Sequence, residues 1–356
     1  MTANRLCPAG DEAFRSTFAA LAARDADAAF AAAFAQGGDS PTVLVSGPRH
    51  KTCDDPVGLQ APWHIGSITK SFTAALTLQL AERGFLALDA PAGSLLERHA
   101  EGMHPDWRAI TLRQALSHTG GLPANVSLLQ LLRPGTKDPV AERLSQLRRL
   151  WRKPLRGKAG RFAYSNVGYV LAGAIAEAAA GSSWEALIVS ELAKPLNLSS
   201  LGFGAPKQAE AAWGHQSFLG FQTPKDPEKE GSDNPAWMGP AGGLHLNLAD
   251  LAKWGQTQLA AAKGTRRDVL TRESAQAMQT AVTGDYGFGW VVQPMPADNA
   301  TVVWANGSNT FWYALLAMVP ERDLVIAVAL NRFDQNRGDT ALQDLLQAIL
   351  EQDRLS

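Results

Sequence analysis

The sequence predicts an α/β protein in which an antiparallel sheet, flanked by terminal helices, carries a large inserted helical lobe. Two observations lead to this prediction. Short runs rich in β-branched and aromatic residues occur near both ends of the chain, at 41–47 and after residue 285. Between them, apolar residues recur mainly at helical spacing. We therefore expect a discontinuous sheet domain, residues 1–66 plus 283–356, and a mainly helical domain, residues 67–282, with a catalytic groove between them.

Composition narrows the classes of partner. The chain has 356 residues, of which 46% are hydrophobic, and its 33 basic and 34 acidic side chains nearly cancel. No field of one sign is therefore available to attract nucleic acid or an anionic membrane surface. No stretch reaches the roughly 18 uninterrupted apolar residues of a membrane span. A small-molecule or peptide-like partner is favoured, and the oligomeric state stays open.

The first elements are read from apolar spacing. Phe14, Phe18 and Leu21, then Phe30 and Phe34, recur at helical spacing before a glycine pair, so residues 11–36 are predicted as one amphipathic helix. The run PTVLVSG (41–47) predicts a strand. From Ser67 the helical pattern returns and ends near Gly84, so a helix is expected to begin at this serine.

Helices are then expected within TLRQALSHTGGLP (111–123), NVGYVLAGAIAEAAAG (166–181) and NLADLAKWGQTQLAAA (247–262). The polar, proline-rich stretch 221–235 is expected to be a surface loop that helps to shape a substrate entrance. After it, YGFGWVVQP, TVVWANG, TFWYALLAMVP and DLVIAVALN predict strands, with a hairpin tip at 320–323. The final stretch, 340–352, predicts a helix.

The motif Ser67-Ile68-Thr69-Lys70 carries the first chemical signal. On a helix, residues three apart share a face, so Lys70 is expected beside the hydroxyl of Ser67. A serine becomes a strong nucleophile when a neighbouring base takes its proton, and burial can lower the pKa of a lysine enough for this role. The backbone N–H of Ser67 would also point at a developing oxyanion. The plain alternative is a polar start to a helix.

A second motif, Tyr164-Ser165-Asn166, directly precedes a predicted helix. A tyrosine near a lysine cation has a lowered pKa and can relay a proton to a leaving group. The amide of Asn166 can accept a hydrogen bond from Lys70 and donate one to a substrate carbonyl. The structural alternatives are a half-buried aromatic ring for Tyr164 and a helix cap for Asn166.

Six stretches of the chain, in this order along the sequence, carry a resemblance to a known family. They are WHIGSITKSFTAAL, TLRQALSHTGGLP, FAYSNVGYVLAGAIAE, AGGLHLNLADLAKWGQTQL, YGFGWVV and NGSNTFWYALLAMVPERDLVIAVALNR. Over about residues 41–335 it resembles the serine β-lactamase and penicillin-binding-protein family, in particular the branch of class C β-lactamases, D-alanyl-D-alanine carboxypeptidases and family VIII esterases. The resemblance implies an acyl-enzyme on Ser67, with Lys70 as base or proton relay and Tyr164 as the base that activates the deacylating water. Which of the two takes the first proton stays open.

The family's third motif, Lys-Thr-Gly or His-x-Gly on a strand, has no literal match on the predicted sheet. His118-Thr119-Gly120 matches by letter but follows a helix, and Val282-Thr283-Gly284 is a second candidate. We choose Ala305-Asn306-Gly307, because it stands between two predicted strands. Ala305 then replaces the family's cation, which helps to hold a substrate carboxylate. The backbone N–H of Ser308 is still available as the second oxyanion donor.

We therefore expect a serine hydrolase acting on an ester or small amide, with weak or no β-lactamase activity; the alternative is a catalytically impaired member that binds a cell-wall peptide or another ligand. No cofactor is expected. The seven histidines show no metal-ligand spacing, so no metal is expected, and His64 is expected to be structural. Cys7 and Cys53 can form a disulfide in an oxidising compartment, which slightly favours a periplasmic or secreted location.

Overall fold

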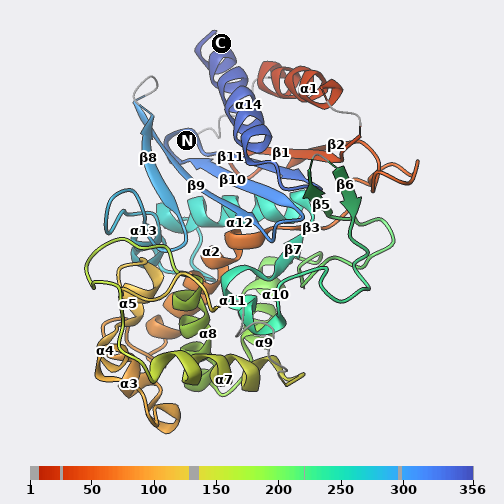
Figure 1. Ribbon diagram of the computed structural model, residues 1–356. Coiled ribbons are helices and arrows are strands. Elements are labelled where there is room, and N and C mark those ends of the chain that lie inside the picture. The colour runs from red at the N-terminus through yellow and green to blue at the C-terminus, as the bar shows by residue number, and fades with distance from the viewer. Residues whose placement is uncertain (1–7, 25–26, 128–135, 220, 296–298, 356) are drawn as a thin grey trace.

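The computed structural model describes residues 8–24, 27–127, 136–219, 221–295 and 299–355 (Figure 1). Its centre is a six-stranded antiparallel sheet in the order β2-β1-β11-β10-β9-β8. A three-stranded sheet, β3-β7-β4, and the hairpin β5-β6 lie beside it. The strands are β1 (Phe30–Gln36), β2 (Thr42–Ser46), β3 (Trp63–His64), β4 (Gly202–Phe203), β5 (His215–Phe218), β6 (Phe221–Pro224), β7 (Leu244–Leu246), β8 (Val291–Met295), β9 (Ala300–Ser308), β10 (Tyr313–Val319) and β11 (Leu324–Leu330).

Helices cover both faces of the main sheet and form a lobe below it (Figure 1). The α-helices are α1 (Pro8–Ala23), α2 (Thr69–Glu82), α3 (Ala92–Leu95), α4 (Pro105–Ala109), α5 (Leu112–Leu116), α7 (Pro139–Trp151), α8 (Asn166–Ala180), α9 (Trp184–Leu187), α10 (Lys194–Leu196), α11 (Gly239–Gly242), α12 (Leu248–Lys263), α13 (Arg272–Met278) and α14 (Gln335–Leu355). Short 3₁₀ turns are η1 (Gly66–Ile68), η2 (Glu97–His99), η4 (Ala236–Met238) and η6 (Pro320–Arg322), and η3 (Ile188–Ala193) is a π-helical turn. The predicted α/β fold is confirmed.

Two hydrophobic cores follow from this layering. The terminal helices α1 and α14 pack together and cover one face of the sheet. The other face packs on α12, and this second core continues without a break through α2 and α8 into the helical lobe. Helix α12 lies within the range predicted for the helical domain, yet it contacts β1, β10 and β11. The division into two domains stays a prediction.

The single helix predicted for residues 11–36 is wrong in its second half. Helix α1 ends at Ala23, and residues 30–36 form β1, which pairs with both β2 and β11. Residues four apart lie on one face of a strand as well as of a helix, so Phe30 and Phe34 satisfied both patterns. In the structure Phe18 stacks on Phe30 with ring centroids 4.9 Å apart, while Ala31 and Ala33 belong to the core on the α12 side of the sheet.

The remaining predicted elements are largely confirmed. The strand at 41–47, the four late strands and the hairpin tip at 320–323 are present, with Asp323 in a left-handed conformation at the tip. The 221–235 stretch lies largely at the surface, as predicted, but its first residues form β6 and Asp233 contacts the buried His64. Within the described ranges, no helix is both long and apolar enough to span a bilayer. Cys7 lies outside the described residues, so its pairing with Cys53 stays a prediction.

Candidate active site

The serine of the first motif stands at the junction of the sheet and the helical lobe. It lies inside η1, directly after β3, and α2 begins two residues later at Thr69 rather than at the serine itself. Gly66 has φ of +49°, a conformation that glycine adopts without steric cost, and this turn redirects the chain from β3 into α2. Lys70 follows in the first turn of α2 and is 1% exposed.

The ammonium nitrogen of Lys70 is surrounded by three oxygens. Its Nζ lies 3.0 Å from Ser67 Oγ, 2.7 Å from Asn166 Oδ1 and 2.6 Å from the carbonyl oxygen of Ala241. Burial lowers the pKa of Lys70, although the neighbouring Tyr164 opposes this shift. A neutral amine has two N–H groups for Asn166 and Ala241, which leaves its lone pair for the hydroxyl of Ser67. This arrangement can remove the proton of Ser67.

Tyr164 and Asn166 reach the same point from the start of α8. The hydroxyl of Tyr164 donates to Ser67 Oγ at 2.8 Å, so this oxygen contacts both candidate bases. Between them, Ser165 caps α8 by accepting from the N–H of Gly168 at 2.9 Å and donates to the carbonyl of Pro123 at 2.6 Å. The cap therefore fixes the two functional side chains that flank it.

Asn166 has a second partner that the sequence reading missed. Its Nδ2 donates to Oδ1 of Asn125 at 2.7 Å, which leaves its Oδ1 facing Lys70. Asn125 follows the LSHTGGLP stretch on a connecting segment, and no spacing rule singles it out. Only the fold brings these two amides together.

The literal match His118-Thr119-Gly120 lies beside the site but not on the sheet, as expected. His118 follows α5, and its Nδ1 accepts from the N–H of Ser165 at 3.1 Å. Its ring lies against Tyr164, with centroids 4.4 Å apart. Burial, with a smaller contribution from the charge of Lys70, lowers the pKa of His118 to about 3. A neutral ring that supports Tyr164 is therefore its role in the fold.

Strand β9 supplies the opposite wall. A Cβ on Gly307 would overlap the backbone nitrogen of Ser67, and one on Gly66 would overlap the backbone nitrogen of Ser308. The backbones of η1 and β9 therefore touch, and they bring the N–H groups of Ser67 and Ser308 close together, as two oxyanion donors require. Glycine is needed at both positions because any side chain would push the two segments apart.

The residues of the third motif face opposite ways, since side chains alternate along a strand. Ala305 is 7% exposed and belongs to the core on the α2 side of the sheet. Asn306 directs its side chain to the other face, where Nδ2 donates to the hydroxyl of Tyr313 at 2.9 Å. Its predicted contact with substrate is thus limited to the backbone. The structure does not bring its amide to Ser67.

A cavity of about 190 Å³ opens at this point, and the larger cavities of the described residues lie elsewhere. Its lining residues are Ser67, Lys70, Phe162, Tyr164, Asp285, Tyr286, Gly289, Val291, Trp304, Ala305 and Asn306. Lys70 is the basic side chain of this lining and Asp285 the acidic one. Oδ2 of Asp285 accepts from the amide of Gln293 at 2.9 Å. Asp285 and Tyr286 were missed as site residues, although they adjoin the YGFGWVV stretch.

The described residues contain no cluster of three or more histidine, cysteine or carboxylate side chains placed to hold a metal ion.

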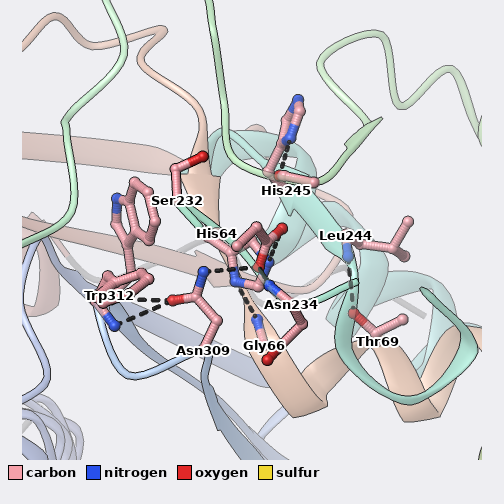
Figure 2. A network of polar contacts seen from close by, with 12 residues as sticks. His64, Gly66, Thr69, Ser232, Asn234, Leu244, His245, Asn309 and Trp312 are labelled. Carbon is pink, nitrogen blue, oxygen red and sulfur yellow. Dashed lines mark hydrogen bonds and ion pairs between the residues drawn. The ribbon is translucent and has the colours of Figure 1, made fainter. Parts of the chain in front are cut away.

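His64, expected to be structural, is fully buried beneath η1, where its Nδ1 accepts from the N–H of Gly66 at 3.1 Å. Its surroundings involve Asp233 and Asn309, which the sequence reading did not single out (Figure 2).

Comparisons with known proteins identify relatives over most of the chain. The chain is 26% identical over 311 residues to penicillin-binding protein 4 of Amycolatopsis lactamdurans, a match covering 81% of this chain and 77% of that protein. It is also 26% identical over 333 residues to a β-lactamase of Escherichia coli K12, covering 82% and 81% of the two chains.

Solved structures show the same fold. A crystal structure of SurE superimposes with a TM-score of 0.78 at 24% identity, covering 96% of this chain and 76% of that one. A class C β-lactamase from Rhodobacter sphaeroides gives a TM-score of 0.76 at 21% identity, covering 95% and 99%. The family model described as Beta-lactamase matches residues 14–351. The chain therefore belongs to the β-lactamase family, whose members are generally serine hydrolases.

Proposed function

We propose that this protein hydrolyses an ester or small amide through an acyl-enzyme on Ser67, with weak or no activity on β-lactams. The observation that carries the proposal is the position of Ser67 Oγ, within hydrogen-bond distance of both Lys70 Nζ and Tyr164 Oη. Two potential bases on one hydroxyl serve the two half-reactions of an acyl-enzyme mechanism. The close approach of the backbone segments that carry the Ser67 and Ser308 N–H groups supports it, since each half-reaction passes through an oxyanion.

The acylation step follows from these contacts. Ser67 Oγ attacks the carbonyl carbon of the substrate, and its proton passes to Lys70 or Tyr164 as the new C–O bond forms. The tetrahedral intermediate carries its negative charge on the former carbonyl oxygen, between the two N–H groups. When the intermediate collapses, the bond to the leaving alcohol or amine breaks and that group takes a proton from Tyr164 or Lys70.

Deacylation repeats the chemistry with water. Tyr164 is 40% exposed, whereas Lys70 is 1% exposed, so the tyrosine hydroxyl is the base that solvent can reach. In this proposal Tyr164, left as phenolate once its proton has gone to the leaving group, takes a proton from the water that attacks the acyl carbon. The ester bond to Ser67 then breaks, and Ser67 Oγ regains the proton that Lys70 has held since acylation.

The expected substrate lacks a carboxylate next to the scissile bond. By the resemblance of the sequence, Ala305 stands where the family has a lysine or histidine, and it borders the cavity. Asp285 is an exposed carboxylate in the same lining. A substrate anion would meet no cation at β9 and would be repelled by Asp285. A neutral acyl group fits this lining better than a penicillin does.

Intact-mass measurement tests the proposal. Wild-type protein and Ser67→Ala are exposed separately to a fluorophosphonate and to benzylpenicillin, and the mass gained by each is recorded. Fluorophosphonate labelling of wild type but not of Ser67→Ala is the expected result, followed by turnover of p-nitrophenyl esters. A lack of labelling by both reagents would instead favour a binding protein that has lost catalysis. Benzylpenicillin turnover comparable to ester turnover would contradict the proposed substrate class.

A further inference from the structure

A chain of polar contacts connects η1 to the turn that follows β9 (Figure 2). It begins at η1, where the N–H of Gly66 donates to Nδ1 of His64 at 3.1 Å. Because Nδ1 accepts this bond, the other ring nitrogen, Nε2, carries a hydrogen. Nε2 lies 3.1 Å from Oδ2 of Asp233, and the described residues offer it no other hydrogen-bond partner.

Asp233 continues the chain toward β9. Its Oδ1 accepts from Nδ2 of Asn309 at 2.8 Å and from the N–H of Asn234 at 2.7 Å. Burial opposes ionisation of Asp233, but His64 and the hydrogen bonds from Asn309 and Asn234 hold the pKa of its carboxyl below the ordinary value. The carboxylate is therefore charged at neutral pH and joins two segments that are far apart in sequence.

Asn309 fixes the turn that follows β9. Its Oδ1 accepts from the N–H groups of Phe311 and Trp312 at 3.1 and 3.3 Å. Ser308 closes the same turn, since its Oγ donates to the carbonyl of Trp312 at 2.5 Å and accepts from the N–H of Thr310 at 2.8 Å. Thr310 holds φ at +77°, which is strained for a β-branched residue and requires such support.

We propose that His64, Asp233 and Asn309 are positioning residues that fix the separation of the Ser67 and Ser308 N–H groups. This inference rests on the proposed function, because an oxyanion hole has meaning only for an enzyme. One end of the chain, His64, is bonded to Gly66, the residue before Ser67, and the other end is Asn309, the residue after Ser308. Asp233, the central member, comes from a third segment that contributes no group to the cavity lining. Loss of its carboxylate frees η1 and the 308–312 turn from each other.

Replacement of Asp233 by alanine tests the proposal, with Asp226→Ala as the matched control. Asp226 lies in the same segment and accepts from a backbone N–H two residues ahead at 3.0 Å, but it is not part of the chain of contacts. The steady-state rate of hydrolysis of a p-nitrophenyl ester is measured for each protein. The rate is divided by the concentration of active sites, which is determined by complete labelling with a fluorophosphonate. Asp233→Ala should lower kcat about ten- to a hundredfold and leave KM within about twofold of wild type. Asp226→Ala should change neither.

A tetrahedral inhibitor gives a second readout. Phenylboronic acid forms a B–O bond to a serine Oγ, and the resulting adduct places a negatively polarised oxygen between the N–H groups. Its inhibition constant should rise in Asp233→Ala by about the same factor as kcat falls. Asn309→Ala should raise the inhibition constant similarly. The double variant Asp233→Ala with Asn309→Ala should raise it little more than either single variant, because both substitutions break the same chain of contacts.

Hydrogen exchange measured by mass spectrometry makes the test independent of activity. Asp233→Ala should accelerate exchange in the peptides containing residues 65–68 and 307–312 together, and Asp226→Ala should accelerate neither. Unchanged exchange in both peptides overturns the inference even if the wild type is inert. An unchanged kcat per titrated site also overturns it. Absence of serine labelling in the wild type would count against the proposed function alone.

Discussion

At the scale of single residues, Lys70 controls the pH dependence expected of the reaction. Its pKa is lowered by burial, so the neutral amine, which we propose as a base for Ser67, is populated below the ordinary lysine pKa of about 10.4. As pH rises, kcat/KM for an ester should increase through the lowered pKa of Lys70 and then level off. A profile of kcat/KM against pH measures this rise and its plateau. A rate that still rises without levelling at pH 10 would contradict the assignment.

Lys70→Arg is the variant for this profile, because arginine stays charged and cannot act as the base. We expect kcat/KM of this variant to be about 10²- to 10⁴-fold lower, and the rise with pH that we attribute to Lys70 to be absent from its profile. Lys263→Arg serves as the control, since this lysine pairs with Asp323 at the surface, far along the chain from the motif. Its profile should match that of the wild type.

Ala305 carries the second prediction at this scale. A lysine at this position would place a cation at the wall of the cavity, where a charge-assisted hydrogen bond to a substrate carboxylate is worth about 1.5–3 kcal/mol. Ala305→Lys should therefore raise kcat/KM for benzylpenicillin relative to a neutral ester by about tenfold or more. Ala305→Met, of similar length but uncharged, should not. Parallel assays on both substrates measure the ratio, and an equal change for the two substrates would refute the role of the charge.

At the scale of elements, the contact between η1 and β9 depends on the absence of side chains. A methyl group on Gly307 would collide with the backbone of Ile65 and Ser67, so Gly307→Ala should separate the two N–H groups and lower kcat by about 100-fold or more. Gly38→Ala is the control, because its added methyl meets no atom within 4 Å. Kinetics and thermal melting of both variants provide the measurement. Wild-type kcat in Gly307→Ala would contradict the close approach.

The elements also show what local patterns can and cannot predict. The late strands were predictable because turns bound each β-rich run, and the Ser67-Lys70 spacing was predictable because one helical turn fixes it. Strand β1 was not, since Phe30 and Phe34 fit helix and strand equally well. Its identity depends on pairing with β11, about 300 residues away, which no local period reveals. Asp233 was missed for the same reason: only tertiary contacts distinguish it from other acidic residues in a polar segment.

At the scale of the whole molecule, one hydrophobic core joins the sheet to the helical lobe. Buried residues of β10 and β11 belong to the same contiguous cluster as Leu147 of α7 and Ile175 of α8. A shared core of this kind leaves little surface along which the two parts can separate, so we expect them to unfold as one cooperative unit. A substitution deep in the helical lobe should therefore weaken the sheet by the same free energy.

Arg143 provides that substitution. It is fully buried on α7, forms ion pairs with Glu177 and Glu185, and donates to the carbonyl of Trp237 at 3.0 Å. Burial raises the pKa of Glu177 despite this pairing, which shows how strongly the site disfavours an uncompensated charge. Arg143→Met should lower the free energy of unfolding by about 3–5 kcal/mol, because it leaves Glu177 buried without its partner.

Native-state hydrogen exchange measures whether the sheet loses as much stability as the helical lobe. In Arg143→Met, the slowest amides of β10 and β11 should lose as much protection as those of α8, because both exchange through global unfolding. Arg143→Met with Glu177→Met should recover most of the stability in both regions, since the more deeply buried carboxylate is removed with its partner and Glu185 is 22% exposed. A loss of protection confined to α7 and α8 would mean that the helical lobe opens alone. The groove would then lie at a boundary between independent units, and the N–H groups of Ser67 and Ser308 would depend on the chain through Asp233 rather than on the common core.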